Sequence, residues 1–312
     1  MRKIKAITLH MLLSSYNATL MSPIFGLSIL SFCVYMIYIH ELKSILTKKM
    51  PTIELDFQDF ITQLGCTKSI KELRDKIPML GVDLESIDEE KIVVEVFPNR
   101  PDLLSVEGFT RALRGFMGLE LGLKKYPVSE SGVTLKVDGS VEKIRPYIAA
   151  AVIRNLSLDG KRLISLMNLQ EKLHVTHGRH RKKVAIGVHD MRDVKGPFTY
   201  KAVEPDSIRF CALDMDKKLT LAQILKKHPK GRDYSWILSG LSRYPIIVDK
   251  NNNVLSFPPI INGELTRLRY STNDVFIDVT GLDDSAVNQA LNILVTSLAD
   301  RGGKIESVKL IS

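Results

Sequence analysis

The sequence predicts an α+β (mixed α/β) fold, in which a small N-terminal α/β module is followed by a larger domain with a mixed sheet flanked by helices. The chain has 312 residues, of which 45% are hydrophobic and 25% are charged, an ordinary globular composition with room for two or three domains. From residue 50 onward, runs with apolar residues at alternate positions, typical of strands, are interspersed with runs of helical periodicity. Such interspersed elements favour a sheet with helices packed against it.

Residues 1–49 form an apolar N-terminal extension. No Lys, Arg, Asp or Glu occurs between residues 6 and 39, and residues 23–39 approach the length needed to cross a bilayer. Either the start is mis-assigned and Met50 is the true first residue, or the segment is a membrane anchor or another kind of extension. A membrane partner is expected only if the extension is genuine. Otherwise a cytoplasmic location is expected, since the three cysteines are far apart and form no CxxC pair.

Residues 50–120 have the pattern of a small α/β module. Strands are expected at residues 52–56 and 91–97. The capping-box sequence of residues 69–72 starts a helix that ends by Gly81. A second helix is expected before Gly118, and its apolar face consists of Leu103, Val106, Phe109, Leu113, Phe116 and Met117.

Residues 121–146 are polar and loop-like, and we expect them to link the module to a larger domain at residues 147–312. Strands are expected there at residues 147–153, 183–188, 244–248, 253–257 and 274–280. Helices are expected at residues 160–174, 220–228 and 284–299, with a turn at residues 249–254.

The sequence contains none of the common short motifs that would identify a nucleotide-binding or hydrolytic site. No Walker A loop, GxGxxG, HExxH or GxSxG occurs in the sequence. His174, His177 and His180 are spaced by three residues, and on a helix they would share a face able to bind zinc. Gly178 and the adjoining basic residues favour a loop instead, so no metal site is expected.

The basic run that follows these histidines has two interpretations. It is either a solvated loop or a set of contacts to phosphate groups, and residues 226–232 form a similar run. In the second interpretation the contacting residues are Arg179, Arg181, Lys182 and Lys183.

The sequence DVFIDVT, residues 274–280, places polar groups in an apolar strand. Phe276, Asp278 and Thr280 share one face of it, because alternate residues of a strand point the same way. This patch is either the solvent face of the strand or the polar end of a small-molecule pocket. In the second case VLSFPPIING, residues 254–263, forms the apolar wall, with its two prolines stiffening the corner.

Five motifs stand in the order and spacing of one family: FPNRPDLLSVEGFTRALRGFMG, LQEKLH, VAIGVHD, VLSFPPIING and DVFIDVTGLD. They resemble the beta subunit of phenylalanyl-tRNA synthetase of the archaeal and eukaryotic type, over residues 50–312. The resemblance implies an N-terminal module and a tRNA-editing domain, with tRNA(Phe) and the synthetase alpha subunit as partners. The family's subunit continues beyond this sequence, so the sequence corresponds to a truncated subunit, a split subunit or a standalone form.

The resemblance also implies an activity. That activity is hydrolysis of mischarged tyrosyl-tRNA(Phe) at its aminoacyl ester by a positioned water, with help from the terminal ribose hydroxyl of the tRNA. The chain alone is not expected to charge tRNA or to hold a cofactor, because ATP and magnesium belong to the complete synthetase. The alternative is a non-catalytic module that binds tRNA or the partner subunit, or a remnant of a split gene.

Four positions, Ile247, Ser256, Asp278 and Thr280, match family positions implicated in tyrosine recognition or hydrolysis. Asp278 would either orient the water or accept the phenol proton. If the basic run described above contacts phosphate groups, tRNA is the expected ligand. Catalysis is assigned to Asp278, Thr280 and Ser256, and substrate binding to Ile247, Phe257, Pro258, Pro259, Ile260, Asn262, Phe276 and His189.

Overall fold

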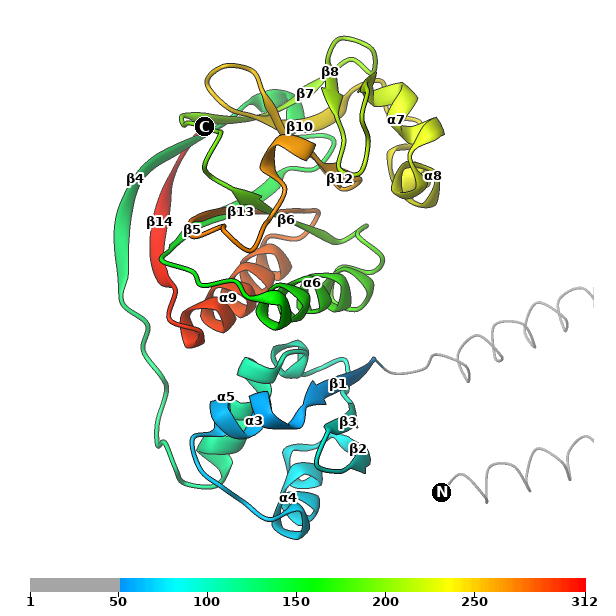
Figure 1. The fold of residues 1–312 in the computed structure, drawn as a ribbon. Coiled ribbons are helices and arrows are strands. Elements are labelled where there is room, and N and C mark those ends of the chain that lie inside the picture. Colours follow the sequence, from blue (N-terminus) through cyan, green and yellow to red (C-terminus); the bar gives the residue numbers. More distant parts are fainter. Residues whose placement is uncertain (1–50) are drawn as a thin grey trace, which may run out of the picture. The chain divides into compact units, whose positions relative to one another are not determined.

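The computed structural model describes residues 51–312 (Figure 1). The interpretations of residues 1–49 lie outside the described residues. Within residues 51–312, no helix has both the length and the apolar character needed to cross a membrane.

A small α/β module forms the first part of the described chain. Its three strands form an antiparallel sheet in the order β1-β3-β2. The elements follow the chain as β1 (Thr52–Asp56), α3 (Phe57–Leu64), α4 (Ile70–Lys76), η1 (Ile77–Leu80), β2 (Asp83–Ile87), β3 (Lys91–Glu95), η2 (Pro101–Leu103) and α5 (Val106–Phe116).

Local sequence signals explain where these helices begin and end. Ser69 accepts a hydrogen bond from the backbone of Glu72 while the Glu72 carboxylate accepts one from the Ser69 backbone, which confirms the predicted capping box. Gly118 adopts a positive φ of 71° just beyond α5, as a helix-ending glycine does. Most of the predicted apolar face of α5 is buried, but Phe116 is 44% exposed, contrary to the prediction.

The larger part of the chain is built on a nine-stranded mixed sheet in the order β12-β11-β10-β7-β4-β14-β5-β13-β6. β4 pairs in parallel with β7 and β14, and the other pairs are antiparallel. The strands are β4 (Val128–Val137), β5 (Tyr147–Arg154), β6 (Val184–Asp190), β7 (Phe198–Val203), β10 (Tyr244–Val248), β11 (Val254–Phe257), β12 (Ile261–Asn262), β13 (Val275–Gly281) and β14 (Lys304–Ile311). The mixed sheet that the sequence predicted is confirmed.

Helices cover this sheet on one face, and a smaller cap lies at its β10–β12 end. α6 (Gly160–Val175) and α9 (Asp284–Asp300) pack beside each other against β5, β13 and β6 (Figure 1). The cap consists of short elements: β8 (Arg209–Cys211), β9 (Lys218–Thr220), α7 (Leu221–Lys227), α8 (Pro229–Tyr234), η4 (Ser235–Leu238) and η5 (Glu264–Thr266). A further short element, η3 (Gly139–Val141), lies between β4 and β5 in the chain and packs against β7.

The expected linker at residues 121–146 is partly wrong. β4 occupies Val128–Val137 and lies between β7 and β14 in the large sheet. Nearly all of its side chains remain exposed or half-buried, so the strand lacks the apolar alternation that marks buried strands. The loop that remains before the sheet covers residues 118–127.

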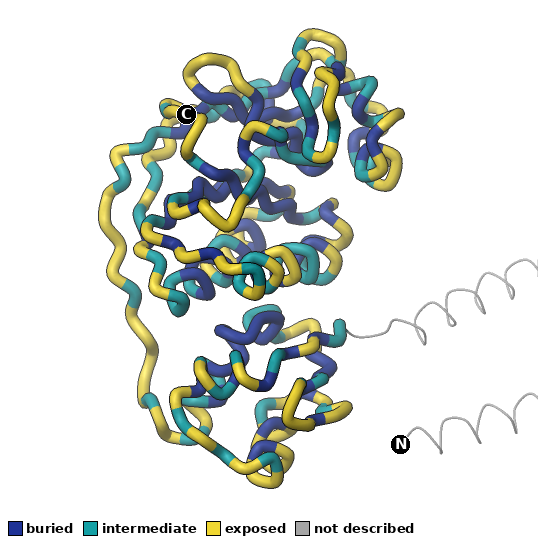
Figure 2. Tube along the Cα trace, viewed as in Figure 1, coloured by how far each residue is buried: buried dark blue, intermediate teal, exposed yellow. Residues whose placement is uncertain are grey.

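β13 lies between β5 and β6, and both of its faces are buried (Figure 2). Val275, Ile277 and Val279 pack into the core formed with α6 and α9. Phe276 faces the opposite core, where its ring centroid lies 4.4 Å from that of Phe198. The predicted alternation is therefore confirmed, whereas the interpretation of the polar side as a solvent face is wrong.

The small module packs against the helical layer through a shared apolar core. Arg301, which follows α9, is central to this contact. Its guanidinium donates two hydrogen bonds of 2.6 Å to the Asp59 carboxylate and one of 2.5 Å to Glu107. Burial alone would lower the pKa of Arg301, but the hydrogen bonds and charges of the two carboxylates raise it above its ordinary value.

We expect Arg301→Ala to lower the free energy of unfolding by about 3–5 kcal/mol, because the buried Glu107 and the half-buried Asp59 would lose their cation. Urea denaturation measures this change. Lys161→Ala is the matched control, since Lys161 also bridges to the module, at Asp56, but is 77% exposed and should contribute at most about 1 kcal/mol. Equal losses for the two variants would contradict the structural role of Arg301.

Candidate functional site

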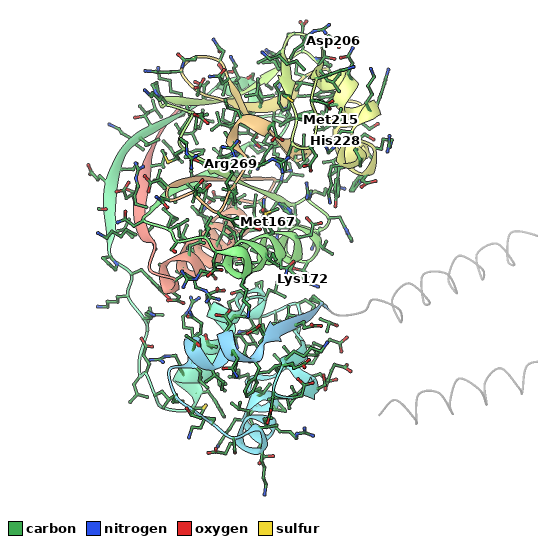
Figure 3. The ribbon with its side chains drawn as sticks, viewed as in Figure 1. Met167, Lys172, Asp206, Met215, His228 and Arg269 are labelled. Atoms are coloured by element: carbon green, nitrogen blue, oxygen red, sulfur yellow. The ribbon has the colours of Figure 1, made fainter. Side chains whose placement is uncertain are left out.

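A pocket of about 580 Å³ lies where the two edges of the large sheet approach each other. β6 forms one edge and the β11–β12 hairpin forms the other. The Asn262 side chain donates a hydrogen bond of 3.4 Å to the Val188 carbonyl and so bridges them. α6 supplies one side of the pocket and the start of α8 another, as shown by the labelled lining residues Met167 and His228 (Figure 3).

Asp278 is one of the most deeply buried polar residues that line this pocket. Its side chain is 1% exposed, and its Oδ1 lies 2.7 Å from Nε2 of the fully buried His189. The other ring nitrogen, Nδ1, lies 2.8 Å from the Thr266 hydroxyl on η5. Within residues 51–312, Asp278 Oδ2 has no protein hydrogen-bond donor. The carboxylate is thus fixed through one oxygen, and the second oxygen can accept a hydrogen bond from a ligand.

Gly187 makes this arrangement possible. It lies on β6 directly opposite Asp278, and His189 is two residues further along the same face. A Cβ at position 187 would overlap both Asp278 Oδ1 and His189 Nε2. The hydrogen bond between His189 and Asp278 therefore crosses the space that a side chain would fill.

The proline-containing wall occupies the place that the sequence suggested. β11 turns back into β12, with Ser256 opposite Asn262 and Phe257 opposite Ile261. The lining residues of this segment are Ser256, Pro258, Pro259, Ile260, Ile261 and Asn262. The corner is thus an edge hairpin and a pocket wall at the same time, and the buried prolines contribute apolar surface without backbone donors.

Two side chains of α6 form hydrogen bonds with the backbone of β6 at its unpaired edge. His174 Nε2 accepts a hydrogen bond of 2.8 Å from the Ile186 backbone N–H, and Gln170 donates one of 2.8 Å to the Ile186 carbonyl. Burial lowers the pKa of His174 to about 4, although the hydrogen bond to Glu171 opposes that shift, so this imidazole is neutral at pH 7.

The three histidines considered for zinc do not converge. His174 binds the β6 backbone, whereas His177 Nε2 lies 2.9 Å from the Ala286 carbonyl and His180 is exposed. Within residues 51–312, the carboxylates close enough to share a cation are Asp83, Glu85 and Glu95, which lie on β2 and β3 outside the pocket.

Some residues of the basic run are buried or paired within the protein, and others are exposed. Arg181 is buried in the pocket wall, where it donates to the Ile260 carbonyl at 3.0 Å and to Glu171 at 2.9 Å. Lys183 pairs with Asp283 at 3.1 Å. Arg179 and Lys182 remain exposed, so only these two match the expected solvent-facing basic loop.

Comparison with known proteins gives a consistent family. Residues 140–299 match the B3/4 domain family. The chain is 50% identical over 263 residues to the phenylalanine–tRNA ligase beta subunit of Methanococcoides burtonii, covering 84% of this chain and 48% of that protein. It is 50% identical over 264 residues to the subunit of Methanothrix thermoacetophila, with the same coverage.

A solved structure agrees with these relatives. It is the crystal structure of an N-terminal fragment of the phenylalanyl-tRNA synthetase beta subunit from Pyrococcus horikoshii, which matches with a TM-score of 0.80 and 40% identity. The match covers 84% of this chain and 77% of the fragment. The chain belongs to the phenylalanine–tRNA ligase beta-subunit family. It spans about half the length of the curated relatives that it matches.

Five of the residues assigned to the site from the sequence do not themselves line the pocket. Ile247 and Phe276 belong to the apolar core that also contains Phe198, and Phe257 packs beside Tyr244 in the cap core. Thr280 shares the face of Asp278 but is directed to a different partner. Asp278, Ser256, Pro258, Pro259, Ile260 and Asn262 line the pocket, and His189 reaches it through Asp278.

The partner of Thr280 is Arg145, a residue that the sequence did not single out. Arg145 is 2% exposed, and its Nε donates to the Thr280 hydroxyl at 2.9 Å. It also donates to the carbonyls of Thr280, Arg181 and Lys182, and so holds the basic loop against β13. Burial lowers the pKa of Arg145 to about 10, which still leaves it charged at pH 7.

We expect Gly187→Ala to lower the free energy of unfolding by about 1–3 kcal/mol, because its Cβ forces apart the His189–Asp278 pair in a packed sheet. The measurement is urea denaturation. Gly139→Ala serves as the control, since a Cβ there meets nothing within 4 Å and the backbone φ is unstrained. A stable Gly187→Ala protein with an unchanged His189 NMR signal would show that the pair tolerates a side chain.

The neutral His174 predicts a loss of stability in acid. Its ordinary pKa of 6.5 applies to the unfolded chain and its lowered pKa of about 4 to the folded one. The unfolded state therefore binds the proton first, and stability present above pH 6.5 falls by an amount of the order of 3 kcal/mol as the pH decreases to about 4.

Denaturation curves across this pH range test the effect. His174→Gln should flatten the slope, since an amide keeps an acceptor for the Ile186 N–H but does not titrate. His180→Gln, at an exposed position, should retain the wild-type slope. The same slope in all three proteins would exclude His174 as the origin.

Proposed function

We propose that the pocket binds the tyrosyl group of a mischarged tyrosyl-tRNA(Phe) and that the chain hydrolyses its aminoacyl ester. The observation that carries this proposal is a fixed, buried carboxylate with one unpartnered oxygen at the inner end of a largely apolar pocket. The names of the relatives support the choice of a tRNA substrate. A cytoplasmic location, and tRNA(Phe) and a synthetase alpha subunit as partners, belong to the same proposal.

The pocket suits one aromatic amino acid. Its volume of about 580 Å³ lies within the usual range for small-molecule sites, roughly 300–1,000 Å³. Pro258, Pro259 and Ile260 provide one apolar wall, while Val188 and Met167 lie on the facing elements. An aromatic ring entering between these surfaces would replace water at apolar side chains, which favours binding.

The attachment to tRNA fixes the direction of entry. The ester joins the amino acid to a large polymer, so that end must stay at the pocket mouth. The ring then points inward, where its para-hydroxyl can reach the buried carboxylate of Asp278. We therefore assign Asp278 to the phenol hydroxyl, which donates its proton to Oδ2 while His189 holds Oδ1.

This assignment gives the discrimination that an editing site requires. Phenylalanine differs from tyrosine only by the hydroxyl, and a site built to bind phenylalanine rejects the extra hydroxyl only about a hundredfold. A site that forms a hydrogen bond with the hydroxyl instead favours tyrosine over phenylalanine. Phenylalanine would leave the buried Asp278 oxygen without a donor, so the correct product is disfavoured.

Hydrolysis itself takes place at the mouth. Water adds to the ester carbonyl carbon, the bond from that carbon to the ribose oxygen breaks, and a proton of the water ends on the ribose oxygen. The products are tyrosine and uncharged tRNA. The neighbouring ribose hydroxyl of the tRNA is well placed to relay this proton, and no side chain is required as a covalent nucleophile. Ser256 and Asn262 also line the pocket.

We expect Asp278→Asn to lower kcat/KM for deacylation of tyrosyl-tRNA(Phe) by about tenfold to a hundredfold, since a hydrogen bond to a charged group contributes about 1.5–3 kcal/mol. Residual hydrolysis of phenylalanyl-tRNA(Phe) should not decrease, because the variant removes the buried charge that disfavours phenylalanine. Asp190→Asn is the matched control: Asp190 is a buried carboxylate on β6 held by Thr272 and outside the pocket. Its variant should deacylate at the wild-type rate.

Two outcomes would contradict the proposal. A parallel decrease with both aminoacyl-tRNAs would mean that Asp278 orients water rather than the phenol. Failure of the wild-type chain to hydrolyse tyrosyl-tRNA, despite binding tRNA, would favour the non-catalytic binding module. A thermal melt of each variant shows whether a loss of activity reflects unfolding.

A further inference from the structure

Two basic segments that are distant in the sequence meet beside the pocket. One is the loop Arg179–Lys183, and the other is residues 226–232, which end α7 and begin α8. The Arg181 guanidinium lies over the Tyr234 ring at 4.6 Å, and Lys230 Nζ lies 5.7 Å from the same ring centroid. These contacts join the two segments at the pocket wall.

The second segment carries the cations that remain available for a ligand. Lys226, Lys227 and Arg232 are exposed, and none of them pairs with a carboxylate within residues 51–312. In contrast, Arg181 is paired with Glu171 and Lys183 with Asp283. Unpaired exposed cations on one short segment favour a polyanion as the ligand.

An exposed aromatic side chain follows the basic segment in the chain. Trp236 lies on η4, immediately after α8, and it is 51% exposed. It is the one tryptophan of the chain. A large exposed indole that follows exposed cations closely in the chain is a combination found in proteins that bind single-stranded nucleic acids, because bases stack on the ring while phosphates meet the cations.

The location links this surface to the pocket. His228 and Lys230, which belong to the same segment, line the pocket itself. A strand bound along Lys226, Lys227 and Arg232 would therefore have its end close to the mouth. A duplex could contact the cations, but its stacked bases would not be free to stack on Trp236.

We propose that the α7–α8 segment and Trp236 (the α7–α8 surface) bind the unpaired 3′ end of an RNA and deliver it to the pocket. The inference rests on the proposed function for the identity of that RNA as a tRNA. The surface is distinct from the predicted tRNA-binding run, of which two members are used within the protein.

Binding of a fluorescein-labelled single-stranded RNA of about eight nucleotides to the full chain tests the proposal, because such surfaces hold roughly 4–16 nucleotides. The triple variant Lys226→Ala/Lys227→Ala/Arg232→Ala should bind roughly tenfold more weakly at low salt. Its plot of log affinity against log salt should be shallower by about 2, since each phosphate contact of a single strand contributes about 0.7.

The matched control is Lys71→Ala/Lys76→Ala/Lys125→Ala, which removes the same charge from exposed residues of the small module and the following loop. It should bind RNA like the wild type. Trp236→Ala should weaken binding about fivefold or more, and Trp236→Phe should weaken it less, because a smaller ring still stacks. The single tryptophan also allows direct titration of the wild type by quenching of its fluorescence.

Equal weakening by the two triple variants would overturn the inference, as would tighter binding of a blunt RNA duplex of equal length. Poly-glutamate represents an acidic protein partner. If it quenches Trp236 and competes as well as the RNA does, the surface binds acidic proteins and not RNA bases.

Hydrolysis assays with two substrates distinguish failure of this inference from failure of the proposed function. The α7–α8 triple variant should raise KM for tyrosyl-tRNA but hydrolyse a tyrosyl ester of adenosine like the wild type, because that substrate is too short to reach the surface. If the wild type hydrolyses neither substrate while the RNA-binding differences persist, the proposed function fails and the RNA surface stands. If hydrolysis occurs and the triple variant binds RNA normally, only the RNA surface fails.

Discussion

A carboxylate buried inside the sheet is the constraint on which the site depends. Asp278 is 1% exposed on a strand with both faces covered, and such a charge is tolerated only where hydrogen bonds replace its water. His189 meets this requirement from the neighbouring strand. That contact in turn requires a glycine at position 187, and it requires Thr266 to hold the other side of the imidazole. One buried charge thus determines residues on β6, β13 and η5.

The geometry of the sheet determines where the pocket forms. Nine twisted strands bring β6 and β12, the two edges, close enough for Asn262 to reach the Val188 carbonyl. Edge strands expose unpaired backbone groups, and here α6 satisfies those of Ile186 through His174 and Gln170. The gap between the edges is therefore lined by ordered groups on both sides, which preorganises it for a ligand.

Much of this arrangement was predictable from the sequence, because strands with two buried faces or regular alternation are visible in it. β10 was predicted with the bounds that it has, and β5 and β13 to within one residue. β4, β7 and β14 were not predicted. The side chains of β4 and β14 are mostly exposed or half-buried, which weakens their pattern, whereas β7 is buried at alternate positions and could have been predicted from that alternation. Asp278 and the proline wall were found from local pattern and resemblance. Thr266 and Arg145 were not, because their contacts span 77 and 135 residues and leave no local signal.

Arg145 explains why Asp278 remains free to bind a ligand. A buried cation near a buried carboxylate would ordinarily form an ion pair with it, and both oxygens would then be occupied. Here the guanidinium is satisfied by three backbone carbonyls and the Thr280 hydroxyl instead. Arg145 and Asp278 therefore attract each other electrostatically without forming a hydrogen bond. Thr280 and Asp278, two residues apart on one face, accordingly have separate tasks. Thr280 anchors Arg145 and the basic loop, and Asp278 keeps one oxygen for the phenol of the proposed substrate.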